Sequence, residues 1–225
     1  MVWVILPVKG LDKSKQRLAE VLSVHQRQCL AKAMLKDVLQ TVSKAKGVEQ
    51  ILVVTADPDI ARLAYEYDAQ VLMEPPHCHG LNQAVDLGVK HAGFHGAERA
   101  LVLHGDIPMV TASDITFLVD NHYEGGATLV PDKCEGGTNG LLIDVPTTIQ
   151  FQYGEDSFHK HLESCREQGL VCNIAEIENL TLDIDSPEDL LELSRRLIDK
   201  PDSATSECMR SAELQQAIMD IRRAS

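Results

Sequence analysis

The chain has 225 residues, of which 44% are hydrophobic, 24% charged and only 4% aromatic, and its formal net charge is −13 at pH 7. This length is enough for one domain with a well-buried core. The acidic charge argues against a duplex nucleic-acid partner or an anionic membrane surface, and the few aromatic residues argue against a platform for stacking bases.

The first seven residues are apolar but too few to span a membrane, and they lack the charged start of a signal peptide. We therefore expect them to form a buried strand. Six cysteines are scattered along the chain without a C-x-x-C pair. This pattern favours reduced thiols in a cytoplasmic protein over disulfides or a zinc site.

Apolar segments typical of buried strands alternate with segments of helical periodicity along the chain. Strands are expected at 2–8, 51–55, 70–73, 100–103, 127–130, 140–143, 171–175 and 181–185. Helices are expected in the regions 30–42, 58–67, 80–92, 113–121, 157–168 and 187–198. The alternation indicates an α/β fold with a mostly parallel sheet, in which ligands bind beyond the carboxyl ends of the strands.

The composition changes after Lys200, where residues 201–206 are small and polar and are typical of a linker. Leu214, Ile218 and Ile221 then recur at the spacing of a short amphipathic helix. We therefore expect one domain over 1–200, followed by a linker and a C-terminal helix over 201–225. This helix could pack on the domain, serve a partner subunit or be partly disordered, and it is our reason for expecting a homodimer.

A basic island follows the first predicted strand in an otherwise acidic protein. It consists of Lys9, Lys13, Lys15 and Arg17. Because α/β proteins hold phosphates at this position, the cluster predicts a clamp for a polyphosphate. A solvated helix start explains Lys13 alone better, and the two common phosphate loops, G-x-x-x-x-G-K-[ST] and G-x-G-x-x-G, are absent from the sequence.

The segment 181–190 joins a predicted strand to a predicted helix. Asp183 and Asp185 share one face of that strand, with their carboxylates roughly 6–7 Å apart, where like charges repel unless a cation is near. Ser186 suits the N-cap, Pro187 the first helical position and Asp189 the capping box. The two aspartates are then free of a capping role, and a divalent cation site is favoured over a solvated strand face.

Asp106 is a third carboxylate without a structural task. It follows the strand predicted at 100–103, and Thr111 and Ser113 lie closer to the next helix and can cap it. Together with the aspartates of 181–185 it could hold Mg²⁺, which prefers a few carboxylates plus substrate phosphates. His104 is interpreted as a packed strand residue rather than a base.

Two glycine-containing loops place hydroxyl groups where a ligand can approach the backbone. Thr138 and Asn139 stand among three glycines in 136–140; a plain tight turn would explain the glycines but not this pair of residues between them. In 154–157 Ser157 opens a predicted helix, whose amino terminus suits an anion, although N-capping by Asp156 or Ser157 explains that segment equally well.

Two further signals lie close together. His77, Cys78 and His79 look metal-like, but they are too close in sequence to chelate well and are interpreted as a loop. Asn82, two residues after Gly80, could present its amide to the edge of a nucleobase.

Six of these segments, in this order, resemble the CofC/FbiD guanylyltransferases of coenzyme F420 biosynthesis. They lie at 6–10 with 15–18, 80–82, 105–108, 136–140, 154–158 and 182–190. Six segments in order are a specific signal, whereas one would mean little. The sequence departs from the family pattern at Tyr153, where Phe is expected before Gly154, and the tail beyond about residue 200 is not matched.

The resemblance implies a three-layer, Rossmann-like nucleotidyltransferase fold of the glycosyltransferase-A type. It implies Mg²⁺-dependent transfer of GMP from GTP to 2-phospho-L-lactate, phosphoenolpyruvate or 3-phospho-D-glycerate, with release of pyrophosphate. Carried over by position, it implies metal ligands at Asp106, Asp183 and Asp185. It implies acceptor contacts at Thr138, Gly154 and Ser157, and nucleotide contacts at Lys9, Gly10, Lys15, Arg17, Gly80 and Asn82, the last near guanine. Lys9, Lys15, Arg17 and Asp106 are the expected catalytic residues.

Two other readings remain open. A molybdenum-cofactor guanylyltransferase or a sugar-nucleotide synthetase would have a glycine-rich or arginine-bearing opening loop, whereas 6–10 here carries one lysine and one glycine. A non-catalytic nucleotide-binding regulator on the same fold would have little use for three unassigned carboxylates.

Overall fold

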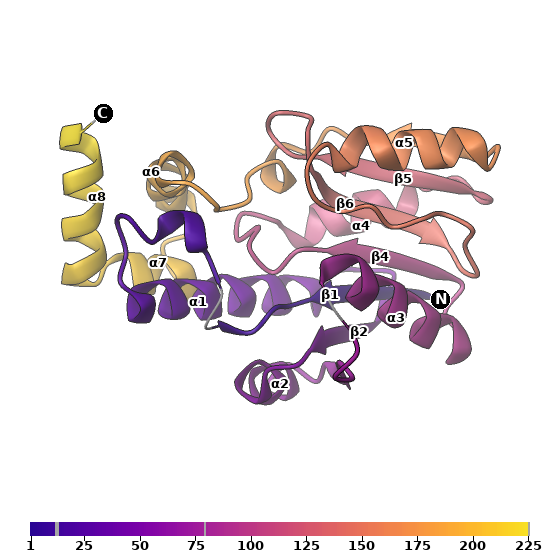
Figure 1. Cartoon of the computed structure of the whole chain (residues 1–225), viewed down its shortest axis with the longest axis horizontal. Helices are drawn as coiled ribbons and strands as arrows, with labels where there is room; N and C mark the ends of the chain where they lie inside the picture. Colours follow the sequence, from indigo (N-terminus) through magenta and orange to yellow (C-terminus); the bar gives the residue numbers. More distant parts are fainter. Residues whose placement is uncertain (12–13, 79, 225) are drawn as a thin grey trace.

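The computed structural model describes residues 1–11, 14–78 and 80–224 (Figure 1). The strands are β1 (Val2–Pro7), β2 (Val48–Thr55), β3 (Gln70–Met73), β4 (Arg99–Leu103), β5 (Gly126–Pro131), β6 (Thr138–Asp144) and β7 (Val171–Ile174). They form a seven-stranded sheet in the order β3-β2-β1-β4-β6-β5-β7. β6 runs antiparallel to β4 and β5, and the other paired strands are parallel, so the predicted mostly parallel sheet is confirmed.

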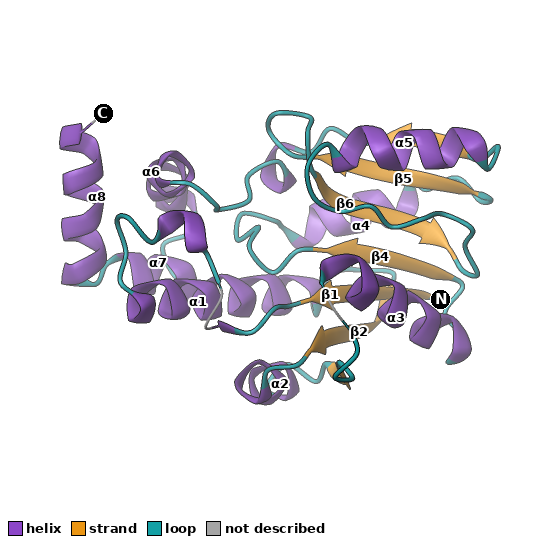
Figure 2. Cartoon of the chain, in the orientation of Figure 1, coloured by secondary structure: helices purple, strands orange, loops and turns teal. Residues whose placement is uncertain are grey.

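The helices are α1 (Val24–Val42), α2 (Pro58–Tyr65), α3 (Leu81–Phe94), α4 (Ala112–Asp120), α5 (Ser157–Glu167), α6 (Pro187–Arg196), α7 (Ala204–Met209) and α8 (Ala212–Ala224). Helices α3 and α5 cover one face of the sheet, and α1, α2 and α4 cover the other (Figure 2). Each face has its own cluster of buried apolar side chains, as a three-layer α/β fold requires. None of the helices in the described ranges is long and apolar enough to cross a membrane.

A third apolar cluster lies beyond the carboxyl ends of the parallel strands, where α6, α7 and α8 gather beside the first half of α1 (Figure 1). Leu214, Ile218 and Ile221 of α8 are buried in it, together with Leu18 and Leu30. The C-terminal helix therefore packs on its own chain. Its apolar face does not need a second subunit to cover it, which removes our reason for expecting a homodimer.

The segment predicted as a linker is fixed to the domain. Helix α7 begins at Ala204 inside it, and both carboxylate oxygens of the buried Asp37 on α1 accept backbone N–H bonds, from Ala204 and Thr205, at 2.8 Å each. The ammonium of Lys200 donates to the carbonyls of Pro108, Met109 and Val110. Residues 204–206, which we predicted as part of a linker, form the first turn of α7, and Ser203 caps that helix.

The strand predicted at 181–185 is also not formed. Its backbone pairs with two separate loops instead of one strand: Lys133 donates to the Thr181 carbonyl at 2.9 Å, and Ile184 donates to the Asp106 carbonyl at 3.2 Å. The predicted alternation nevertheless holds, because Leu182 and Ile184 are buried while the aspartates beside them are partly exposed.

The caps predicted from sequence are confirmed. Ser186 and Asp189 form a capping box at the start of α6, with Pro187 in its first turn. Thr111 and Asp114 do the same for α4. Asp106, Asp183 and Asp185 are thus left without a capping role.

Candidate active site

A buried lysine bridges two of the three aspartates at the carboxyl ends of β1 and β4. The Lys15 ammonium contacts Asp106 Oδ2 and lies 2.9 Å from Asp185 Oδ1, and its side chain is 7% exposed. Burial alone would lower the pKa of Lys15, but the two carboxylates outweigh it and hold the pKa above the usual value. Lys15 is therefore a fixed positive charge between Asp106 and Asp185.

Asp183 completes the acidic group without contacting that ammonium. Burial, and then the charges of Asp106 and Asp185, raise its pKa to about 6. Its Oδ1 accepts a hydrogen bond of 3.3 Å from Asn139 Nδ2, which also donates to the Leu180 carbonyl at 2.8 Å. Asn139 thus positions Asp183. The sequence placed Asn139 in a glycine-rich loop but gave it no role.

The three carboxylates fit a hard cation by their chemistry. Asp106 Oδ1 is buried without a hydrogen-bond partner, and Asp183 carries a charge that its surroundings disfavour. Within the described ranges, however, no group of three or more His, Cys, Asp or Glu side chains is arranged to hold a metal. The Lys15 ammonium takes one oxygen each of Asp106 and Asp185.

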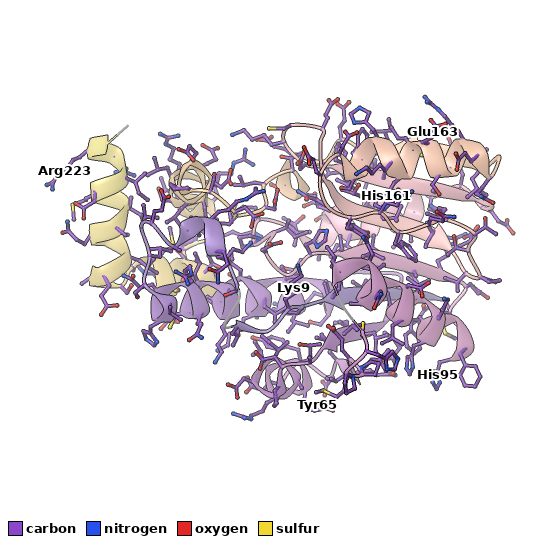
Figure 3. All side chains as sticks on the ribbon, viewed as in Figure 1. Lys9, Tyr65, His95, His161, Glu163 and Arg223 are labelled. Carbon is purple, nitrogen blue, oxygen red and sulfur yellow. The ribbon has the colours of Figure 1, made fainter. Side chains whose placement is uncertain are left out.

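The other basic residues that follow β1, Lys9 and Arg17, are exposed. Arg17 is 80% exposed and its Nη1 lies 4.0 Å from Asp185 Oδ2. The Leu11 amide, directly after Gly10, donates to Asp57 Oδ2 at 2.9 Å. Lys9 is exposed and lies on the side of the sheet that faces α6 to α8 (Figure 3). Lys13 lies outside the described residues, as does His79 of the 77–79 segment.

The structure brings Thr138 and Ser157 together, as expected for two parts of one site. The Thr138 amide donates to Ser157 Oγ at 3.0 Å, and the Thr138 hydroxyl lies 2.9 Å from His161 Nδ1. Both residues are almost fully buried. Their hydroxyls therefore bond within the protein, and the exposed backbone at Gly154 is the more open part of this region.

Capping does not explain Ser157. Asp156 takes the N-cap position of α5, with a left-handed φ of 57° and no side-chain cap bond, and its carboxylate instead lies 2.8 Å from His159 Nδ1. The Ser157 hydroxyl accepts from Thr138 rather than from its own helix. Of the two capping candidates, Asp156 holds the N-cap position but makes no side-chain cap bond, and the Phe158 amide in the first turn bonds to the Gly136 carbonyl.

His161, which the sequence analysis missed, lies on the side of α5 that faces the sheet (Figure 3). It hydrogen-bonds both to Thr138 and to the segment before Gly154. The Gln152 amide donates to its Nε2 at 3.0 Å, which leaves the proton on Nδ1 to be donated to Thr138. Burial and the nearby His104 lower the pKa of His161 to about 4. No sequence signal separates this histidine from others on helix surfaces.

Asn82 clamps the segment before Gly154. Its Oδ1 accepts from the Tyr153 amide at 2.6 Å and its Nδ2 donates to the Tyr153 carbonyl at 3.2 Å. The Tyr153 ring packs edge-on against His104 and His161, and His104 Nε2 lies 3.0 Å from the Thr138 carbonyl. His104 thus links Tyr153 to Thr138 from a position just after β4, outside the strand in which we placed it.

Comparisons with known proteins identify the relatives of this chain. A family model described as "Guanylyl transferase CofC like" matches residues 2–219. A phosphoenolpyruvate guanylyltransferase of Conexibacter woesei is 43% identical over 83% of this chain and 84% of its own. A 3-phospho-D-glycerate guanylyltransferase of Colwellia psychrerythraea is 34% identical (83% and 88%), and a 2-phospho-L-lactate guanylyltransferase of Methanothermobacter thermautotrophicus is 31% identical (84% and 82%).

The fold is that of known nucleotidyltransferases. A nucleotidyl transferase from Methanothermobacter has a TM-score of 0.63 at 16% identity, covering 89% of this chain and 99% of its own. A CMP:2-keto-3-deoxy-manno-octonic acid synthetase complexed with CTP has a TM-score of 0.60 at 14% identity, covering 88% and 98%. The chain therefore belongs to the CofC family of guanylyltransferases.

Proposed function

We propose that this protein transfers GMP from GTP to a small phosphorylated three-carbon acid, releasing pyrophosphate, as a step of coenzyme F420 biosynthesis. The observation that carries the proposal is the Lys15 bridge between Asp106 and Asp185, with Arg17 beside it, at the carboxyl ends of the parallel strands. Such a group of opposite charges suits a triphosphate and a cation. The names of the relatives supply the acceptor class.

The basic loop binds the nucleotide in this proposal. Lys9, Gly10, Lys15 and Arg17 hold the triphosphate by charge and backbone contact. Gly80 and Asn82 lie near the guanine, with Asn82 contributing the N–H that Tyr153 does not use.

Mg²⁺ is the proposed metal, with Asp106, Asp183 and Asp185 as its protein ligands. When bound it would neutralise phosphate charge and polarise the phosphorus that is attacked. Asn139 holds Asp183 in place for this role. The unpaired Asp106 Oδ1 supports the assignment, because a buried carboxylate oxygen without a partner is otherwise costly.

The acceptor is proposed to bind at the two loops that meet through Thr138, Gly154 and Ser157. Attack of its phosphate on the α-phosphate brings two anions together, so charge neutralisation and alignment must supply most of the rate enhancement. The residues of the site suit that task, and the reaction needs no covalent nucleophile.

An acceptor panel with mass detection tests the proposal. The protein is mixed with GTP, Mg²⁺ and, separately, phosphoenolpyruvate, 2-phospho-L-lactate and 3-phospho-D-glycerate, and both the guanylylated product and pyrophosphate are measured. We expect product with at least one acid, and we would test phosphoenolpyruvate first. GTP binding without product from any of the three would contradict the proposal and favour a regulator or a different guanylyl acceptor.

A further inference from the structure

Resting on the proposed function, one feature of the acidic group points to how the metal enters. We propose that the Lys15 ammonium and the divalent cation compete for Asp106 and Asp185, so that Lys15 couples metal binding to triphosphate binding. Lys15, besides binding the triphosphate, then keeps the metal site closed until a nucleotide arrives.

The first support is that the Lys15 ammonium already occupies two of the carboxylate oxygens that the metal would use. The ammonium contacts Asp106 Oδ2 and lies 2.9 Å from Asp185 Oδ1. A Mg²⁺ ion bonded to the same oxygens would lie about 2.0–2.1 Å from each, within the space and repulsion range of that ammonium. With Lys15 in place, a cation bound to both of these oxygens would meet the charge of the ammonium at close range.

The second support is that the remaining part of the site is prepared. Asp106 Oδ1 is buried without a partner, and Asn139 holds Asp183 beside the bridge. If Lys15 leaves, the charges of Asp106 and Asp185 act on each other and on Asp183 without the ammonium between them, which favours the entry of a cation. Departure of the ammonium therefore leaves uncompensated negative charge, which a metal ion would neutralise.

The third support is that Lys15 stands at a strained point of the chain. Its φ of 51° and ψ of 46° are left-handed, which is uncommon for a non-glycine residue, and the 3-10 turn Gln16–Leu18 follows directly. A triphosphate offers the ammonium phosphoryl oxygens in place of the two carboxylates. Transfer of Lys15 to the phosphate would free the metal ligands.

Arg17 provides a matched control. It is a second cation near Asp185, at 4.0 Å from Oδ2, but it is 80% exposed and occupies neither oxygen of Asp106. Replacing either residue with methionine removes one positive charge from the neighbourhood. Only the replacement of Lys15 also empties the position between the carboxylates.

The test is binding of Mn²⁺ alone, without nucleotide, followed by the electron paramagnetic resonance signal of free Mn²⁺. Wild type, Lys15→Met, Arg17→Met and the double variant Lys15→Met/Asp185→Asn are titrated. We expect Lys15→Met to tighten Mn²⁺ binding by about tenfold or more, because a direct competitor is gone. Arg17→Met should change it by less than about threefold, because an exposed charge is screened. The double variant should lose the gain.

Three results would overturn the competition: no tightening in Lys15→Met, an equal effect of both single variants, or a double variant that binds as tightly as Lys15→Met. Lys15→Gln, which keeps hydrogen-bonding capacity, and the rise in melting temperature with added Mn²⁺ serve if the methionine variant folds poorly. The proposed function is judged separately, because product from wild type in the acceptor panel does not depend on these titrations. Transfer without tightening would reject the competition alone.

Discussion

The backbone amide of Ile184 donates a hydrogen bond of 3.2 Å to the carbonyl of Asp106. This bond joins the loop after β4 to the segment before α6, although the two are far apart in sequence. Because Asp183 and Asp185 flank Ile184, the bond brings all three carboxylates to one place. Lys15, from a third segment, then bridges two of them.

The first prediction concerns Asn139, which links Asp183 to the Leu180 carbonyl. Asn139→Ala should lower kcat by at least about tenfold, since Asp183 loses its orientation. It should also destabilise the fold by about 1–3 kcal/mol, because a buried carbonyl loses its partner. Steady-state kinetics and a denaturant titration measure both. Unchanged kcat in a destabilised variant would limit Asn139 to a structural role.

The second prediction compares two buried serines of α5. Ser157 Oγ accepts from the Thr138 amide at 3.0 Å, and Ser164 Oγ accepts from the Gln150 amide at 3.1 Å. Ser157→Ala leaves the buried Thr138 N–H without its acceptor and should cost about 1–3 kcal/mol of stability, and Ser164→Ala, at the partly buried Gln150 N–H, should cost no more than that. Ser157→Ala alone should also raise the acceptor KM by roughly tenfold, as expected for one bond to a charged ligand or its support. Equal kinetics for the two variants would remove Ser157 from the acceptor site.

The third prediction is a loss of stability in acid. The pKa of His161 is about 4 in the folded protein, against an ordinary 6.5, so the folded state favours neutral imidazole. Its contribution is complete above pH 6.5 and is lost as the pH falls toward 4, by at most roughly 3 kcal/mol. His161→Gln should flatten this part of the stability curve. His159→Gln, on the exposed side of the same helix, should leave it unchanged, and a curve unaffected by His161→Gln would contradict the assignment.

The fourth prediction concerns the C-terminal helix. Ile218 is 3% exposed and packs in the cluster that contains Leu18, next to Arg17, whereas Met219 is 44% exposed. Ile218→Ala should destabilise the protein by about 2–5 kcal/mol. Met219→Ala should stay within about 0.5 kcal/mol of wild type. Thermal melts of the two variants decide this, and equal melting temperatures would mean that α8 does not contribute to the core.

The layers of the fold and the caps could be predicted because they depend on local patterns. Continuous apolar runs marked β1 and β4, and Ser186 with Asp189 marked the start of α6. The segment 181–185 alternated like a strand, but sequence does not show whether a neighbouring strand is present to pair with it. Its two aspartates still lie where the prediction needed them, because the alternation sets their direction with or without a ladder.

The contacts within the site that could not be predicted join residues that are separated in the sequence. Asn82 binds the backbone of Tyr153, and His161 binds Thr138 and Gln152. Such contacts depend on how loops meet above the sheet. The residues next to Asn82 and His161 in the sequence carry no signal that predicts these contacts. The Lys15 bridge was missed for the same reason. Lys15 was assigned to the triphosphate and the aspartates to the metal, and the sequence does not show that the two groups meet.

Pyrophosphate release tests most directly whether the acidic group of Asp106, Asp183 and Asp185 serves guanylyl transfer. Pyrophosphate release from GTP is measured with phosphoenolpyruvate, 2-phospho-L-lactate and 3-phospho-D-glycerate, using wild type, Asp185→Asn and, as a surface control, Asp86→Asn, whose carboxylate pairs only with the exposed Lys90 among the contacts described. We predict release with at least one acid for wild type and Asp86→Asn, and a loss of roughly a hundredfold or more in a folded Asp185→Asn. Normal turnover of folded Asp185→Asn, or no release by wild type with any acid, would contradict the account.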